Sequence, residues 1–103
     1  MEYKALSVLD ITKRARAAFQ RFDVQKAAVF GSSARGEMHR GSDVDILIDL
    51  GNYSSGLIFI DIKRSLEHAL RRKVDLVSFQ SLEYTDMKDE ILSEAQVIYE
   101  KRP

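Results

Sequence analysis

The feature that most constrains this chain is the pair Gly31-Ser32, followed after ten residues by Asp43-Val44-Asp45. Residues 26–30 and 44–48 are short, mostly apolar segments, which predicts two buried strands. The first strand would end at the Gly-Ser pair, and the second would begin at the acids. If the two strands are antiparallel neighbours, a small-residue turn and two carboxylates meet at one edge of a sheet.

The spacing of Asp43 and Asp45 places both carboxylates on one face of the second strand, with Cα atoms about 6–7 Å apart. Two carboxylates this close repel each other unless a cation lies between them, and their hard oxygen ligands suit Mg²⁺. At the start of a helix, Gly31-Ser32 would offer backbone N–H groups and a hydroxyl that suit a phosphate. A metal site beside a phosphate site predicts phosphoryl or nucleotidyl transfer.

Other site classes are excluded by single residues. Gly31 and Gly36 have the spacing of half a Walker P-loop, but Glu37-Met38 replaces the required Lys and Ser/Thr. Leu47 stands where an EF-hand loop needs Asp or Asn. Neither histidine has a motif relation to Ser32 that would make its hydroxyl a nucleophile. The chain has no cysteine, which excludes disulfides and thiolate metal sites.

The Gly-Ser and Asp-x-Asp pattern resembles the signature of the DNA polymerase β-like nucleotidyltransferase superfamily. Its fuller form, GSSARGEMHRGSDVDILI, is similar to the minimal nucleotidyltransferases, the MNT antitoxins that pair with HEPN toxins. The resemblance spans nearly the whole chain of 103 residues and implies a polymerase β-like fold. Ser33 departs from the pattern, because the family usually carries a larger residue such as Arg or Tyr at this position.

The resemblance requires a third acid on a later strand, and Asp75 in the apolar segment 73–77 is the candidate. A charge inside an apolar strand is costly unless it is paired or bound to a metal. The alternative is an edge-strand aspartate that pairs with Arg71 or Lys73. With the resemblance, Asp43 and Asp45 would bridge two Mg²⁺ ions, and Asp75 would bind the ion that activates the attacking hydroxyl.

The resemblance also implies ATP as the nucleotide donor. The predicted nucleotide contacts are two small residues of the turn, one arginine and one further serine: Gly31, Ser32, Arg35 and Ser42. Arg35 has two interpretations. It either faces a phosphate or the partner, or it braces the loop by pairing with Glu37 or Asp43.

The periodicity of the remaining chain predicts a single α/β (α+β) domain, residues 1–103, with a small mixed three-stranded sheet flanked by helices. A first helix would begin with a capping pair of Ser7 and Asp10. A longer helix from Ser54 or Ser55 to Arg71 would make a crossover, so that the second and third strands are parallel. A last helix would begin at Ser81 or Thr85. The tail 96–99 is either a short strand or a helix end.

Asp49 shares the strand face of Asp45 but lies four residues farther on, roughly 13 Å away. This is too far to share a metal ion, so we interpret Asp49 as a turn residue. Phe59 and Ile60 widen the apolar face of the long helix, which fits either a docking face or a place in the core.

Composition and patterning limit the partners. Lys plus Arg and Asp plus Glu number 16 each, and the resulting formal net charge of zero argues against bulk electrostatic binding to nucleic acid or anionic membrane. The N-terminus has no apolar core of signal-peptide length, and no apolar run approaches a membrane span. We therefore expect a cytoplasmic protein with no membrane partner.

The resemblance implies Mg²⁺-dependent transfer of AMP from ATP to a tyrosine of a cognate HEPN toxin, with this chain as the antitoxin of a hetero-oligomer. Two alternatives remain open. The chain could neutralise its partner by stoichiometric binding, with a vestigial catalytic motif. It could instead be the catalytic subunit of a small-molecule nucleotidyltransferase that resembles the aminoglycoside enzymes.

Overall fold

The computed structural model describes residues 6–39, 41–51 and 56–102 of the chain. Helices and strands mix along this part of the sequence, which confirms the predicted α/β class. In chain order the elements are α1 (Val8–Arg21), β1 (Lys26–Val29), α2 (Gly31–Arg35), β2 (Val44–Asp49), α3 (Gly56–Leu70), β3 (Val74–Ser78), the 3₁₀ helix η1 (Phe79–Tyr84), α4 (Lys88–Glu94) and β4 (Gln96–Glu100). Within the described ranges, no helix combines the length and the apolarity needed to cross a membrane.

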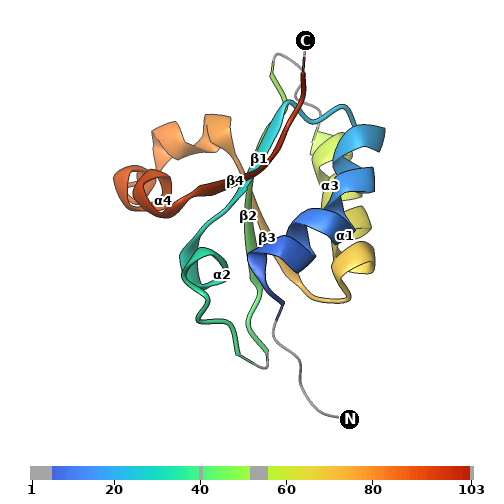
Figure 1. Cartoon of the computed structure of the whole chain (residues 1–103). Coiled ribbons are helices and arrows are strands. Elements are labelled where there is room, and N and C mark those ends of the chain that lie inside the picture. The colour runs from blue at the N-terminus through green and yellow to red at the C-terminus, as the bar shows by residue number, and fades with distance from the viewer. Residues whose placement is uncertain (1–5, 40, 52–55, 103) are drawn as a thin grey trace.

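The strands form one mixed sheet in the order β3-β2-β1-β4 (Figure 1). β1 is antiparallel to both of its neighbours, whereas β2 and β3 are parallel, as the crossover through α3 predicts. The predicted number of three strands is wrong, because the segment 96–100 pairs with the outer edge of β1 as β4. Without this fourth strand, β1 would leave a row of backbone N–H and C=O groups unpaired along that edge.

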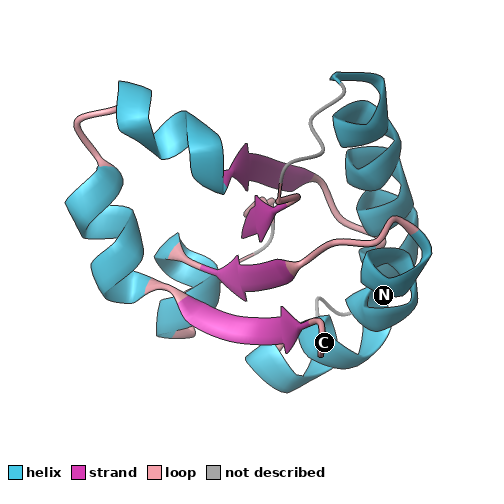
Figure 2. Cartoon of the chain, turned by 90° about the horizontal axis from the view of Figure 1, so that it is seen from above, coloured by secondary structure: helices cyan, strands magenta, loops and turns pink. Residues whose placement is uncertain are grey.

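Helices cover both faces of the sheet (Figure 2). α1 and α3 lie side by side on one face, and η1 and α4 lie on the other (Figure 1). Alternate residues of β2 divide between the two layers: Val44, Ile46 and Ile48 belong to the large core under α1 and α3. Leu47 joins a smaller cluster with Leu82 and Ile91. Because side chains alternate along a strand, Asp45 lies on the same face as Leu47, toward η1 and α4.

The predicted start of α1 is confirmed by a capping box. Ser7 Oγ accepts a hydrogen bond from Asp10 N at 3.0 Å, and Asp10 Oδ2 accepts one from Ser7 N at 3.2 Å. This pair satisfies two backbone N–H groups that the first turn of a helix otherwise leaves without a partner. The predicted starts of α3, Ser54 and Ser55, lie outside the described residues.

The predicted last helix is present as α4, but it begins at Lys88 instead of Ser81 or Thr85, and a separate 3₁₀ helix, η1, precedes it. Ser78 caps η1 by accepting from Ser81 N at 3.2 Å. The backbone at Thr85 is extended, with φ −128° and ψ 144°, and this interrupts the helical path before α4 begins at Lys88. The division lets η1 and α4 each contribute one buried residue, Leu82 and Ile91, to the smaller cluster.

The apolar face of α3 serves the core more than the surface. Phe59 is half-buried and packs against the large cluster, which confirms the core interpretation for this residue. Ile60, by contrast, is 46% exposed.

Candidate active site

Asp45 of β2 lies directly beside Asp75 of β3, because the parallel register pairs these two residues. Neighbouring strands are about 4.8 Å apart, and residues paired in this way lie on the same face of the sheet. Asp43 precedes β2 by one residue and is exposed. The structure thus places Asp45 and Asp75 side by side, and Asp43 lies just before the start of β2.

A cleft of about 360 Å³ opens where these strands begin. Its lining combines the turn after β1, the two paired acids and one side of α4: Phe30, Gly31, Ser32, Arg35, Asp45, Asp75, Met87, Glu90, Ile91 and Glu94. Five of the seven predicted site residues line it: Gly31, Ser32, Arg35, Asp45 and Asp75. Asp43 and Ser42 are not among its lining residues.

Gly31 is required by its backbone and by its neighbour. Its φ of +59° lies in the left-handed region that side chains disfavour. A Cβ atom at this position would lie 2.6 Å from Asp45 Oδ2, far inside contact distance. Glycine therefore lets the start of α2 come into contact with the carboxylate of Asp45.

The environment of Asp45 disfavours its ionised form. Burial is the largest cause, followed by the charges of Asp75 and Asp43, and together they raise the pKa of Asp45 from 3.8 to about 6. The positive charge of Arg35 opposes this shift, and the charge of Glu94 adds to it. A cation bound beside Asp45 would reverse the balance and favour the carboxylate.

Arg35 braces the site instead of pointing freely into the cleft. Its Nε donates to Glu37 at 2.7 Å, and its Nη1 donates to Glu94 of α4 at 2.6 Å. The hydrogen bond that Arg35 donates to Glu37 is the largest of the causes that raise the pKa of Arg35. The predicted pairing with Glu37 is confirmed, and Glu94 takes the place of the alternative partner Asp43.

The two serines that flank the motif have backbone partners. Ser42 Oγ accepts from His39 N at 2.9 Å and closes the turn that leads into β2. Ser33, which the resemblance marked only as a departure, is buried, and its Oγ accepts from Asp45 N at 3.0 Å. Sequence reasoning missed this contact. The one available signal was a small hydroxyl residue at a position where the family carries a large one.

The donor set of the cleft fits a hard cation without being preassembled for one. Its candidate ligands are carboxylate oxygens, which Mg²⁺ prefers. Across the described residues, however, no three acidic or histidine side chains approach closely enough to ligate a metal ion together. The alternative role of Asp75, an ion pair with Arg71 or Lys73, is not observed among residues 56–102.

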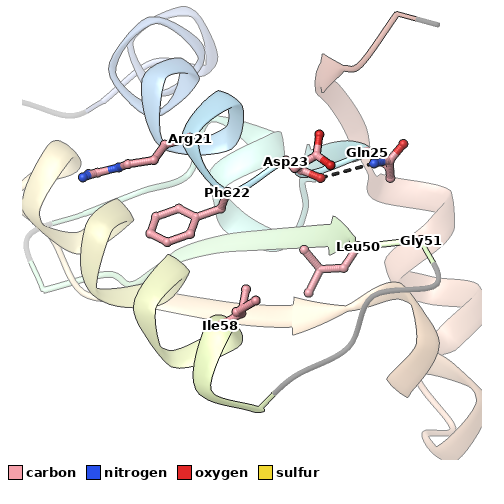
Figure 3. A pocket seen from close by; sticks show the side chains of 7 residues that line it. All are labelled: Arg21, Phe22, Asp23, Gln25, Leu50, Gly51 and Ile58. Atoms are coloured by element: carbon pink, nitrogen blue, oxygen red, sulfur yellow. Dashed lines mark hydrogen bonds between the residues drawn. The ribbon is translucent and has the colours of Figure 1, made fainter.

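A larger cavity, about 720 Å³, lies at the opposite end of the sheet (Figure 3). Phe22, Leu50 and Ile58 point into it, and its charged residues already have partners. Arg21 donates to Ser65 at 3.3 Å, and Asp23 accepts from Lys101. Its lining includes Gly51, the last described residue before the gap at 52–55, so we assign the cavity no role.

Comparison with known sequences points to one family. The family model described as "Polymerase beta, Nucleotidyltransferase" matches residues 13–103. A Methanocaldococcus jannaschii protein, MJ0435, whose name gives protein adenylyltransferase as a provisional activity, is 33% identical over 90 residues, or 87% of this chain and 96% of that protein. The protein adenylyltransferase MntA of Thermococcus cleftensis is 48% identical over 63 residues, or 61% of this chain and 64% of that protein.

The fold has a counterpart among solved structures. A chain in the complex of a tri-AMPylated Shewanella oneidensis HEPN toxin with an MNT antitoxin superimposes with a TM-score of 0.66. The match covers 91% of this chain and 73% of that chain at 15% identity, so it shows a shared fold. Together with the family model, it confirms the predicted polymerase β-like fold.

Proposed function

This chain belongs to the polymerase beta nucleotidyltransferase family, and we propose that it transfers AMP from ATP to a hydroxyl of a partner protein in a Mg²⁺-dependent reaction. The observation that carries the proposal is the cleft in which Asp45 and Asp75 lie beside Gly31 and Ser32. Acids that need a cation thus share one cleft with small residues that leave room for a phosphate. The relatives named as protein adenylyltransferases support AMP as the transferred group.

Asp43, Asp45 and Asp75 are the proposed metal ligands. Asp45 is held against Gly31, whereas Asp43 and Asp75 are exposed, so their side chains can rotate toward Asp45 and complete the donor set. Two Mg²⁺ ions bound there would neutralise charge on the attacking and leaving oxygens of an in-line displacement at the α-phosphorus. We assign Asp75 to the side of the attacking hydroxyl, and Asp43 and Asp45 to both ions.

The turn after β1 is the proposed triphosphate site. Gly31 and Ser32 begin α2, where backbone N–H groups have no acceptor within the helix. Ser42 can donate its hydroxyl proton to a phosphate oxygen while it accepts from His39 N. Arg35 lines the cleft, and it would bind a phosphate once its ion pair with Glu94 is broken. The new O–P bond would form as the bond to the leaving pyrophosphate breaks.

The proposed acceptor is a tyrosine of a HEPN toxin, with this chain as its antitoxin in a hetero-oligomer. The support is twofold: the complex with the shared fold contains an AMPylated HEPN toxin, and the Thermococcus relative is named protein adenylyltransferase. We propose a cytoplasmic location, because the proposed reaction consumes ATP and needs Mg²⁺.

The proposal is tested by incubating the chain with Mg²⁺, a HEPN protein from the same organism, and ATP labelled at either the α- or the γ-phosphate. AMP transfer predicts label on the HEPN protein from α-labelled ATP alone, with release of pyrophosphate. It also predicts that substoichiometric amounts of the chain suffice. Neutralisation that needs a full equivalent and leaves the HEPN protein unlabelled would establish the binding alternative. Label recovered on small molecules would instead indicate the aminoglycoside-like alternative.

A further inference from the structure

Ser33 occupies an unusual place for a polar side chain. Among the residues that the structure describes, it is the one polar or charged residue in the buried class, at 2% exposure. Its Oγ accepts a hydrogen bond from the backbone N–H of Asp45 at 3.0 Å, across 12 positions of sequence. A buried hydroxyl in contact with the backbone of a candidate metal ligand calls for a physical explanation.

The hydrogen bond from Asp45 N to Ser33 Oγ replaces a backbone hydrogen bond that is missing between β1 and β2. Phe30 N donates to Asp45 O at 3.1 Å, which is one half of an antiparallel pair. In a regular ladder, Asp45 N would donate back to Phe30 O. Phe30 O instead accepts from Ala34 N at 3.4 Å, because the chain has turned into α2. Ser33 therefore supplies the acceptor that the turn has removed.

The same turn of α2 also contacts the carboxylate. Gly31 lies against Asp45 Oδ2, so closely that a Cβ would be 2.6 Å away. The backbone N–H of Asp45 is bound to Ser33, and its backbone C=O accepts from Phe30. Residues 30–33 thus hold both the backbone and the carboxylate of Asp45, and Ser33 is the only one of them that does so through a side-chain hydrogen bond in the described structure.

We propose that Ser33 is a positioning residue for Asp45, which fixes the start of β2 so that the Asp45 carboxylate faces the cleft at the depth a shared cation needs. The inference rests on the proposed function, because it takes Asp45 as a metal ligand. Ser33 would not contact substrate. A displacement of about 1 Å at such a ligand is enough to lower a rate by about a hundredfold.

The chain provides a matched control for a test. Ser7 Oγ accepts from Asp10 N at 3.0 Å, the same bond between the same residue types, at the start of α1 and outside the cleft lining. Ser33→Ala and Ser7→Ala should both lower the melting temperature. Only Ser33→Ala should lower kcat for AMP transfer, by about tenfold to a hundredfold. It should also raise the Mg²⁺ concentration needed for half-maximal transfer and leave the KM for the acceptor protein unchanged.

Ser33→Thr keeps a hydroxyl acceptor and should recover most of the lost rate. If Ser33→Ala does not fold, Ser33→Cys replaces it, because the thiol has a similar size and is a weak acceptor. Equal rates for Ser33→Ala and Ser7→Ala would overturn the proposal, as would a Ser33→Thr variant as slow as Ser33→Ala.

A measurement that does not depend on transfer separates this inference from the proposed function. In ¹⁵N NMR spectra, Ser33→Ala should speed hydrogen exchange at the Asp45 amide and weaken the broadening of Asp45 and Asp75 signals by added Mn²⁺. A wild-type protein that transfers nothing would contradict the proposed function, and the NMR comparison would still decide the role of Ser33. Unchanged exchange at the Asp45 amide in Ser33→Ala would overturn the inference alone.

Discussion

The two ends of β2 carry the same residue type in opposite situations. Asp45 and Asp49 lie on the same face of one strand, and both are half-buried. Asp49 Oδ1 accepts from Gly51 N at 2.8 Å and from Gln80 Nε2 at 3.2 Å. The carboxylate of Asp45 accepts from no donor within the described residues, and the charges of Asp75, Asp43 and Glu94 disfavour its ionised form instead.

The contrast teaches that burial and strand position do not distinguish a structural acid from a functional one. What distinguishes them is whether the protein supplies donors for the charge. Asp49 closes a turn, and its hydrogen bonds lower the free energy of the folded state. Asp45 is held in place through its backbone, while its carboxylate has no hydrogen-bond donor among the residues that the structure describes, which is costly unless a cation binds. In the proposed function, a bound cation is that partner.

The sharpest test of this contrast exchanges each acid for alanine. Asp45→Ala should lower AMP transfer by more than about a hundredfold. Loss of a residue that only supports a metal ligand can lower activity by about that much, and loss of the ligand itself should cost more. Its stability without metal should equal or exceed that of the wild type, because repulsion from Asp75 and Asp43 is removed. Asp49→Ala should keep transfer and lose about 1 kcal/mol of stability. Rate assays and urea melts in chelator measure both quantities, and equal effects of the two substitutions on transfer would break the comparison.

The second test adds the missing partner. Mg²⁺ with a non-hydrolysable ATP analogue binds the folded site and hardly the unfolded chain, so a hundredfold excess over the dissociation constant should stabilise by about 2.7 kcal/mol. For a domain of this size, the melting temperature should rise by roughly 10–20 °C. Asp49→Ala should respond like the wild type, and Asp45→Ala should lose most of the response. If all three proteins shift equally, the analogue binds elsewhere.

The third test uses the glycines near each acid. Gly31 and Gly51 both have a left-handed backbone, with φ of +59° and +67°. Alanine at either position should therefore cost about 1–2 kcal/mol of stability. A Cβ at Gly51 would meet the flexible Gln25 side chain at 3.2 Å, whereas at Gly31 it would meet Asp45 Oδ2 at 2.6 Å.

Because of that second contact, Gly31→Ala should also lower transfer by about tenfold or more, whereas Gly51→Ala should leave transfer unchanged. Initial rates measured well below each variant's melting temperature separate the two effects. A loss of stability without loss of transfer in Gly31→Ala would show that the Asp45 carboxylate can move aside without consequence.

Local pattern was sufficient to predict the part of the site that depends on strand geometry. The crossover helix predicted the parallel neighbour that brings Asp75 beside Asp45. The shared face of Asp43 and Asp45 stays a prediction, because Asp43 precedes β2. The Asp49 turn was predicted in the same way, and Gly51 N completes it. Each of these features follows from residues close in sequence or from a single rule of chain connection.

The missed features depend on contacts that no local pattern encodes. Arg35 pairs with Glu94 across 59 positions, and nothing around Glu94 marks it as a partner. The role of Ser33 follows from the point at which the chain leaves β1 for α2, which a sequence resolves only to within a residue or two. A strand was one of two interpretations of the tail 96–99, and only the pairing of β4 with β1 decides between them.

The smallest expected effect is the pH dependence that Asp45 confers on the metal-free protein. Burial and the neighbouring acids raise the pKa of Asp45 from 3.8 to about 6 in the folded state. Between these values the folded chain retains a proton that the unfolded chain has released, so stability should fall as the pH rises from about 4 to about 6. Because the side chain is partly solvated, we expect a change of about 1 kcal/mol rather than the full value of the shift.

Other acids titrate in the same range, so the informative quantity is the difference between variants. Urea melts in chelator at several pH values should show that Asp45→Asn removes this component, since asparagine does not titrate. Asp75→Asn should reduce it by less, because the charge of Asp75 ranks second to burial among its causes. Saturating Mg²⁺ with the ATP analogue binds the ionised carboxylate and should reverse the sign, so that stability rises with pH. An Asp45→Asn protein that keeps the wild-type pH dependence in chelator would show that the Asp45 carboxylate, like that of Asp49, already has its partners within the protein.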